Sequence, residues 1–205
     1  MHLAAIKSEQ KEIFNKLKHF PEFYLVGGTA LALQIGHRIS VDFDLFSEKE
    51  ISPKLLDKVQ KIFNGREMEI VINHSEQLSI KVNGIKIDFV RYNFRPLADL
   101  LDFGGVKLLS VPEIAAAKAY TLGRRITFKD YIDLYFILSK NFSSLPEIIA
   151  ICIKKYKNEF NERLFLEQLI SVEEAEETPI EFLRKFPTKD EMMGFFQKEI
   201  RKLKL

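Results

Sequence analysis

The chain has 205 residues, of which 46% are hydrophobic and 29% are charged, and its formal net charge is +2. These values are close to the average for soluble globular proteins and exclude a peptide-sized scaffold. No stretch approaches the roughly 18 uninterrupted apolar residues of a membrane span. The first 20 residues lack the pattern of a secretory signal, so a cytoplasmic protein is expected.

The first half of the chain mixes helical and strand periods. An amphipathic helix is expected first and a short buried strand next, followed by alternating helices and strands. In chain order, the expected helices cover residues 9–18, 29–34 and 52–63, and the expected strands cover residues 23–26, 41–46, 67–73, 78–82 and 85–92. Asn83 and Gly84 form a two-residue hairpin signal between the last two strands.

The second half is expected to be almost entirely helical after about Lys107. The helical periods cover residues 112–123, 127–140, 145–157 and 189–204. The sequence therefore predicts an α+β fold, with an α/β core over residues 1–107 and a helical C-terminal part over residues 108–205. No low-complexity linker separates these parts, which favours one shared core over independent movement. The helical part is also expected to complete the cleft of the candidate site.

A glycine pair marks the first candidate site. Gly27 and Gly28 precede Thr29 where the first strand turns into a helix. Unpaired amides at the start of a helix attract phosphate. An ordinary strand-to-helix turn explains the same three residues.

Three aspartates mark the second candidate site. If Asp42 and Asp44 lie in one strand, a period of two places both carboxylates on one face and Phe43 on the other. Adjacent like charges need a cation or strong hydrogen bonds, and hard oxygen ligands suit Mg²⁺. Asp88 is the third carboxylate, and it converges on the pair if its strand lies beside theirs. Three such groups can hold two metal ions about 3.5–4 Å apart. An exposed acidic sheet face is the alternative interpretation.

Charged residues elsewhere fit either a functional site or a purely structural role. Lys118 interrupts an alanine-rich helix, so its charge either reaches solvent or meets an anion. Asp130 follows Thr127 at the spacing of a helix cap, and Asp133 could orient Lys118. Arg38 precedes the Asp42 strand and fits either phosphate binding or a loop brace.

The sequence motifs around these residues resemble those of the AbiEii/AbiGii toxin family, which is part of the polymerase-beta-type nucleotidyltransferase superfamily. The resemblance is carried by GGTALALQIGHRISVDFDLF, then GIKIDFV, then IAAAKAYTLGRRITFKDYIDLYFIL. It implies a nucleotidyltransferase-type mixed sheet with flanking helices, Mg²⁺, and transfer of a nucleoside monophosphate from an NTP to an acceptor. In the family the implied acceptor is tRNA or other RNA, and the implied partner is a cognate antitoxin.

The resemblance also implies roles for particular residues. The metal ligands are expected at Asp42, Asp44 and Asp88, and these three act in catalysis together with Lys118 and Asp130. The nucleotide binders that the resemblance implies are Gly28, Thr29 and Lys118, and the residue pattern itself adds Gly27 and Arg38. Two alternatives remain: a nucleotidyltransferase that modifies a small molecule or a protein, as the modest net charge suggests, and a non-catalytic nucleotide-binding or partner-binding module.

Overall fold

A computed structural model describes residues 1–122 and 124–203 of the chain. Gly123 and residue 204, which end two of the expected helices, therefore lie outside the described residues, as does residue 205. The chain divides into two compact units, Met1–Leu109 and Ser110–Leu205. Within the described part of the chain, no helix is long and apolar enough to cross a membrane.

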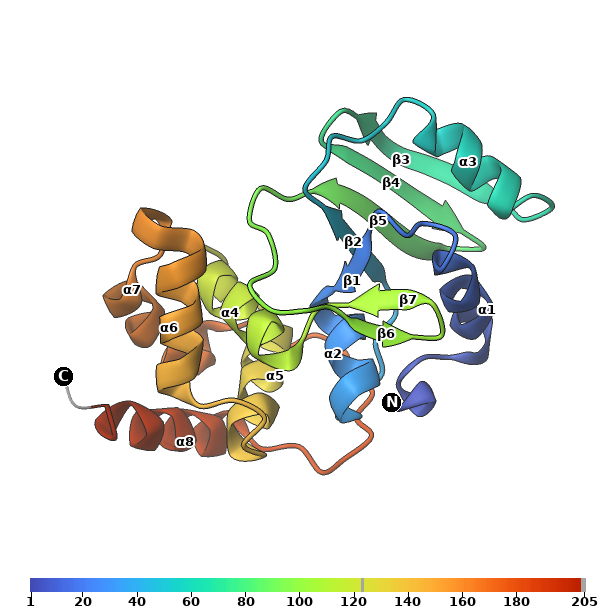
Figure 1. The fold of residues 1–205 in the computed structure, drawn as a ribbon. Coiled ribbons are helices and arrows are strands. Elements are labelled where there is room, and N and C mark those ends of the chain that lie inside the picture. The colour runs from blue at the N-terminus through green and yellow to red at the C-terminus, as the bar shows by residue number, and fades with distance from the viewer. Residues whose placement is uncertain (123, 204–205) are drawn as a thin grey trace. The chain divides into compact units, whose positions relative to one another are not determined.

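The first unit is built on one seven-stranded mixed sheet with the order β3-β4-β5-β2-β1-β7-β6 (Figure 1). Its strands are β1 (Tyr24–Val26), β2 (Phe43–Ser47), β3 (Met68–His74), β4 (Gln77–Val82), β5 (Ile85–Arg91), β6 (Leu101–Phe103) and β7 (Val106–Leu108). The pairs β2–β5 and β1–β7 are parallel, and the other neighbours are antiparallel. The turn between β4 and β5 is the predicted one, with positive φ at both Asn83 and Gly84.

The helices of this unit are the short 3-10 helix η1 (Leu3–Ala5), α1 (Ser8–Leu17), α2 (Gly27–Ile35) and α3 (Leu55–Ile62). Alternation along β2 and β5 separates a face with Phe43, Ile87 and Phe89 from a face that carries the aspartates. On the apolar face Phe43 packs near Phe14 of α1, and Phe89 contacts both Phe20 and Phe23 with ring centroids 4.9 and 5.0 Å apart. This aromatic cluster lies on one face of the central strands, while the opposite face carries Asp44 and Asp88 together with apolar residues such as Phe46 and Val90.

The second unit is helical. It contains α4 (Val111–Leu122), α5 (Phe128–Ser139), α6 (Leu145–Tyr156), α7 (Glu162–Leu169) and α8 (Lys189–Arg201), with the 3-10 helices η2 (Lys157–Glu159) and η3 (Val172–Glu174). Capping boxes start α6 and α8, through Ser144 with Glu147 and Thr188 with Glu191. Tyr131 is fully buried in this unit and donates its hydroxyl to the carbonyl of Gln168 at 2.8 Å.

The α+β prediction is confirmed, and the differences are local. Helix α3 begins at Leu55 rather than Ser52, because residues 52–54 form a turn in which the Leu55 amide donates to the Ser52 carbonyl. Helix α2 begins at Gly27, two residues earlier than expected. The β6–β7 hairpin and α7 were not predicted. Strand β2 begins at Phe43, so Asp42 immediately precedes the strand instead of lying in it.

Candidate active site

Two of the three aspartates lie side by side in the sheet. Asp44 of β2 and Asp88 of β5 are direct Cα partners in the parallel register. Directly opposed residues point to the same face of a sheet, so both carboxylates lie on the face opposite Phe43 and Phe89. Asp88 is only 8% exposed, and Asp44 is half-buried.

Asp42 reaches the same end of the sheet from the loop before β2, where its side chain is exposed. The buried Thr29 hydroxyl of α2 lies within hydrogen-bond distance of the Asp42 carbonyl oxygen, and it lies 2.8 Å from the Ser40 hydroxyl. Thr29 therefore ties the first turn of α2 to the segment that enters β2. Its side chain is engaged within the protein rather than presented to solvent.

The glycine pair stands between an acidic and a basic side chain. Gly27 has φ +67°, and a Cβ at this position would collide with the Asp44 carboxylate. A Cβ on Gly28 would lie 2.5 Å from Arg38 Nη2 and 3.2 Å from the Ser40 hydroxyl. Both side chains can therefore approach the backbone only because residues 27 and 28 are glycines. The predicted nucleotide binder Arg38 is 4% exposed, and its Nη1 donates to the Ile39 carbonyl at 3.1 Å.

A lysine that the sequence analysis did not single out contacts the third aspartate. Lys86 Nζ donates to Asp88 Oδ2 at 2.6 Å. This hydrogen bond raises the pKa of Lys86, and the negative charges of Asp88, Asp44 and Asp42 raise it further, while partial burial opposes them. The ammonium is therefore bound to Asp88, and the charges of Asp44 and Asp42 add a weaker electrostatic stabilisation. The spacing of Lys86 and Asp88, two residues apart in one strand, was the available signal.

The donor chemistry of the site fits a divalent cation. Asp88 Oδ1 is buried and makes no hydrogen bond to any residue that the structure describes. A buried polar atom without a partner is costly, and a bound cation would satisfy it. Over residues 1–122 and 124–203, however, no three His, Cys, Asp or Glu side chains already form a metal-binding group. Asp44 and Asp88 thus offer two adjacent carboxylates, and the third ligand is not preassembled.

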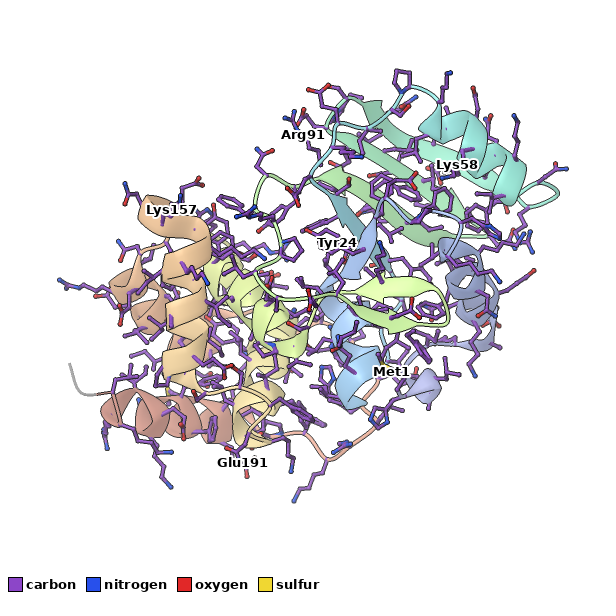
Figure 2. The ribbon with its side chains drawn as sticks, in the orientation of Figure 1. Met1, Tyr24, Lys58, Arg91, Lys157 and Glu191 are labelled. Carbon is purple, nitrogen blue, oxygen red and sulfur yellow. The ribbon has the colours of Figure 1, made fainter. Side chains whose placement is uncertain are left out.

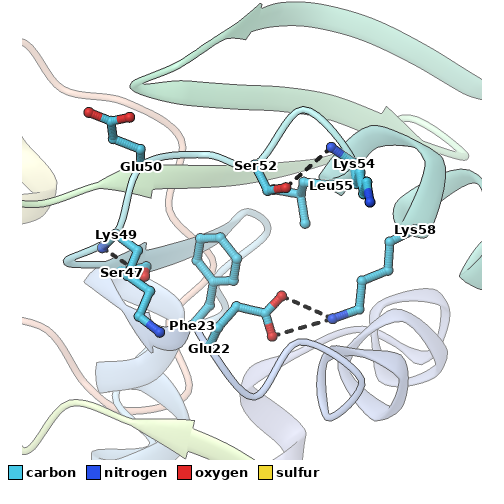
Figure 3. Close-up of a pocket in the computed structure, with 9 residues that line it drawn as sticks. All are labelled: Glu22, Phe23, Ser47, Lys49, Glu50, Ser52, Lys54, Leu55 and Lys58. Carbon is cyan, nitrogen blue, oxygen red and sulfur yellow. Dashed lines mark hydrogen bonds and ion pairs between the residues drawn. The ribbon is translucent and has the colours of Figure 1, made fainter.

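A separate hollow of about 190 Å³ lies at the other end of the central strands (Figure 3). Its lining includes Ser47, the last residue of β2, together with Phe23, just before β1. Tyr24 and Arg91, labelled in Figure 2, mark this end of the sheet. Ser47 is three residues beyond Asp44, or about 10 Å at the usual strand rise.

Lysines surround this hollow, but acidic residues largely balance them. Lys49, Lys54 and Lys58 line it with Glu22 and Glu50. In Figure 3 both carboxylate oxygens of Glu22 point at Lys58, and the shorter of the two distances is 2.9 Å. Because its charges are nearly neutralised and it lies away from Asp44, the hollow is a weaker candidate for a triphosphate site than the glycine turn.

The remaining predicted residues form a buried ion cluster inside the helical unit. Lys118 Nζ of α4 lies 2.8 Å from Asp130 Oδ1 and 2.5 Å from Asp133 Oδ2, both on α5. Arg125 Nη2 adds a longer contact of 3.5 Å to Asp130 Oδ2. Lys118, Asp130 and Asp133 are each at most 8% exposed, whereas the Arg125 side chain is mostly exposed.

The cluster decides between the interpretations that the sequence left open. Lys118 meets anions instead of reaching solvent, and Asp133 orients it. Thr127 is the N-cap residue of α5, but its side chain makes no capping hydrogen bond among the described residues. Asp130 is therefore the partner of Lys118 rather than part of a capping box.

The chain resembles one protein family and several individual proteins. The model of a family described as nucleotidyl transferase AbiEii toxin, type IV TA system, matches residues 12–204. An uncharacterized protein of Aquifex aeolicus (strain VF5), aq_aa25, is 29% identical over 202 residues, which cover 96% of each chain.

Two solved structures share the fold over nearly the whole chain. The protein JHP933 from Helicobacter pylori has a TM-score of 0.53 at 14% identity and covers 96% of this chain and 97% of its own. A protein of H. pylori that is provisionally named a nucleotidyltransferase has a TM-score of 0.54 at 16% identity, and 96% of each chain is covered. These likenesses support the nucleotidyltransferase-type fold. Because the family model spans almost all of the sequence, the chain belongs to the AbiEii family of nucleotidyl transferase toxins.

Proposed function

We propose that this nucleotidyltransferase moves a nucleoside monophosphate from an NTP to an RNA acceptor, tRNA foremost, in a Mg²⁺-dependent reaction in the cytoplasm. In this proposal the protein is the toxin of a toxin–antitoxin or phage-defence pair, and an antitoxin protein opposes it. The observation that carries the chemistry is the register that sets Asp44 beside Asp88. The family membership supports the toxin role.

In the proposed reaction a hydroxyl oxygen of the acceptor bonds to the α-phosphorus of the NTP. The bond from that phosphorus to the oxygen bridging to the β-phosphate breaks, and pyrophosphate leaves. The hydroxyl proton passes to the carboxylate of Asp88, which lies beside Asp44 in the sheet. Mg²⁺, when bound by Asp44 and Asp88 with Asp42, would supply positive charge to the reacting phosphate and lower the pKa of the attacking hydroxyl.

The triphosphate is proposed to bind at the first turn of α2. Amides at a helix start point outward without intrahelical partners, and the dipole of the nine-residue α2 favours an anion there. Gly27 and Gly28 leave the backbone accessible to a phosphate, and Arg38 brings a positive charge next to Gly28. Thr29 contributes its backbone amide, while its hydroxyl braces the turn.

Labelling of RNA tests this function directly. Purified protein is incubated with Mg²⁺, each of the four α-labelled NTPs in turn, and total RNA or tRNA. The wild type is expected to label RNA, and Asp44→Asn and Asp42→Ala are expected to lower the rate by about a hundred- to a thousandfold, as loss of a group that acts on the transition state does. Asp57→Asn, which changes an exposed aspartate of α3, is the matched control and should label normally. Labelling that survives Asp44→Asn would refute the proposed site.

The net charge of +2 favours a second candidate, in which the acceptor is a small hydroxylated molecule or a protein. Salt separates the two candidates, because RNA binding releases counterions and weakens steeply as salt rises. A labelling KM for the acceptor that is nearly independent of salt would favour the second candidate. Growth arrest on expression, lost in Asp44→Asn, would support the toxin role with either acceptor.

A further inference from the structure

Lys86, the lysine beside Asp88, has a different ion-pair partner from the neighbouring Lys81. Lys81 of β4 and Lys86 of β5 are cross-strand partners, and both side chains are 41% exposed. Lys81 Nζ lies 2.9 Å from Glu69 on the edge strand β3. Lys86 Nζ instead turns along its own strand to Asp88 Oδ2 at 2.6 Å. Two cross-strand lysines with equally exposed side chains thus form ion pairs with different carboxylates.

The contact places a cation where the proposed metal ion would bind. One oxygen of Asp88 is held by Lys86, and the other oxygen is buried and makes no hydrogen bond to the described residues. A divalent ion on this carboxylate would stand within a few ångströms of the ammonium. Like charges at such distances repel strongly where water is partly excluded, so the two cations compete for Asp88.

We propose that Lys86 is an internal counter-ion of the carboxylate site, which holds Asp88 in the metal-free protein and must be displaced when a divalent cation binds. This inference rests on the cation site of the proposed function. The four-carbon side chain is flexible and partly exposed, so it can leave Asp88 without unfolding the strand. Lys86 thereby lowers the affinity of the site for metal alone, and its freed ammonium becomes available to the phosphates of a nucleotide.

Binding of Mn²⁺ to the full-length protein, without nucleotide, tests the inference. Free Mn²⁺ is followed by electron paramagnetic resonance for the wild type, Lys86→Met, Lys86→Arg and the matched control Lys81→Met. Lys86→Met should bind Mn²⁺ about tenfold more tightly, since removing a competing charge next to the ion is worth about one factor of ten. Lys86→Arg, which keeps the charge, and Lys81→Met should stay within about twofold of the wild type.

Asp88→Asn identifies the site that is being measured. It should weaken Mn²⁺ binding and abolish the gain from Lys86→Met in the double variant. Binding by the wild type that Asp88→Asn leaves unchanged, or no binding at all, would overturn the cation site together with this inference. Binding that Asp88→Asn weakens but Lys86→Met does not tighten would overturn the inference alone. An equal gain in Lys81→Met would also overturn it, because general surface charge would then explain the effect.

Discussion

The carboxylate of Asp44 occupies the space that a side chain at position 27 would need. Gly27 also has φ +67°, a conformation that side chains disfavour. The glycine therefore does two things: it allows the turn from β1 into α2, and it lets an aspartate of the neighbouring strand pack directly on the backbone of that turn. The proposed phosphate-binding and metal-binding groups are in contact at this point.

Gly27→Ala should damage the site more than its backbone strain explains. Gly65 is the matched control, because its φ is +80° and no described atom lies within 4 Å of a Cβ placed there. Gly65→Ala should lower the free energy of unfolding by about 1 kcal/mol from strain alone. Gly27→Ala should cost about 1–3 kcal/mol more, from overpacking against Asp44, and should also weaken Mn²⁺ binding. Urea unfolding and Mn²⁺ titration measure both effects, and equal losses in the two variants would contradict the contact.

Thr29→Val should destabilise the protein even without nucleotide. The change removes the buried hydroxyl that lies 2.8 Å from Ser40 and close to the Asp42 carbonyl. Leaving these groups unpaired should lower the free energy of unfolding by about 1–3 kcal/mol. Thr29→Ser, which keeps the hydroxyl, should remain closer to the wild type in urea unfolding. If Thr29→Val were as stable as the wild type and lost only NTP affinity, the hydroxyl would be a ligand for phosphate instead of a brace.

Lys118→Met should be strongly destabilising, which complicates any test of Lys118 in the reaction. The substitution leaves Asp130 and Asp133 buried without their cation. Breaking a buried ion pair by removing one partner costs about 3–5 kcal/mol. Lys155→Met provides the matched control, because Lys155 Nζ lies 2.7 Å from Glu113 in an equally buried pair that has no proposed part in the reaction.

Both lysine variants are compared by denaturant unfolding and then by RNA labelling at a temperature where both are folded. If Lys118 acts in the reaction, Lys118→Met should lose labelling by at least about a hundredfold, while Lys155→Met keeps it. Equal labelling by the two folded variants would assign Lys118 to structure alone.

Cys152 should be inert in the folded protein. Burial raises the pKa of its thiol to about 12, and its Sγ lies 3.3 Å from the Ala116 carbonyl. The thiolate is the reactive form, so a thiol reagent at about pH 8 should find no reactive cysteine until denaturant is added. An unfolded thiol ionises near pH 8.5, below the folded pKa, so this residue's contribution to stability is complete below about pH 8 and declines as pH rises toward 12. Rapid labelling of the native protein would contradict this burial.

Local chemistry explains which elements of the fold could be predicted from the sequence. The hairpin at Asn83 and Gly84 follows from the turn type that these residues favour. The β6–β7 hairpin was missed because its strands have three residues each, and β7 is stabilised by parallel pairing with β1 from the start of the chain. A three-residue segment is too short to show a strand period, and its pairing with a distant strand leaves no local signal.

In the candidate site too, local patterns could be predicted from the sequence, but contacts between distant segments could not. The pairing of Asp44 with Asp88 was expected only if their strands were neighbours, and the register supplies that condition. Asp130 was open to interpretation as a cap, because its partner Lys118 lies on another helix. Alternation puts Lys86 on the same face as Asp88, but its contact with Asp88 rather than Glu69 depends on side-chain geometry that alternation does not encode.

The position of β1 inside the sheet, between β2 and β7, affects when the first unit can fold during synthesis. β1 needs β2 on one side and β7 on the other, and β2 needs β5 before Asp44 and Asp88 can meet. Pairings between distant segments form late, because the intervening chain must first be made and closed into a loop. A growing chain that has passed β2 but not yet β5 therefore lacks the paired aspartates of the proposed site. The cell making this toxin is exposed to it only after most of the first unit has been synthesised.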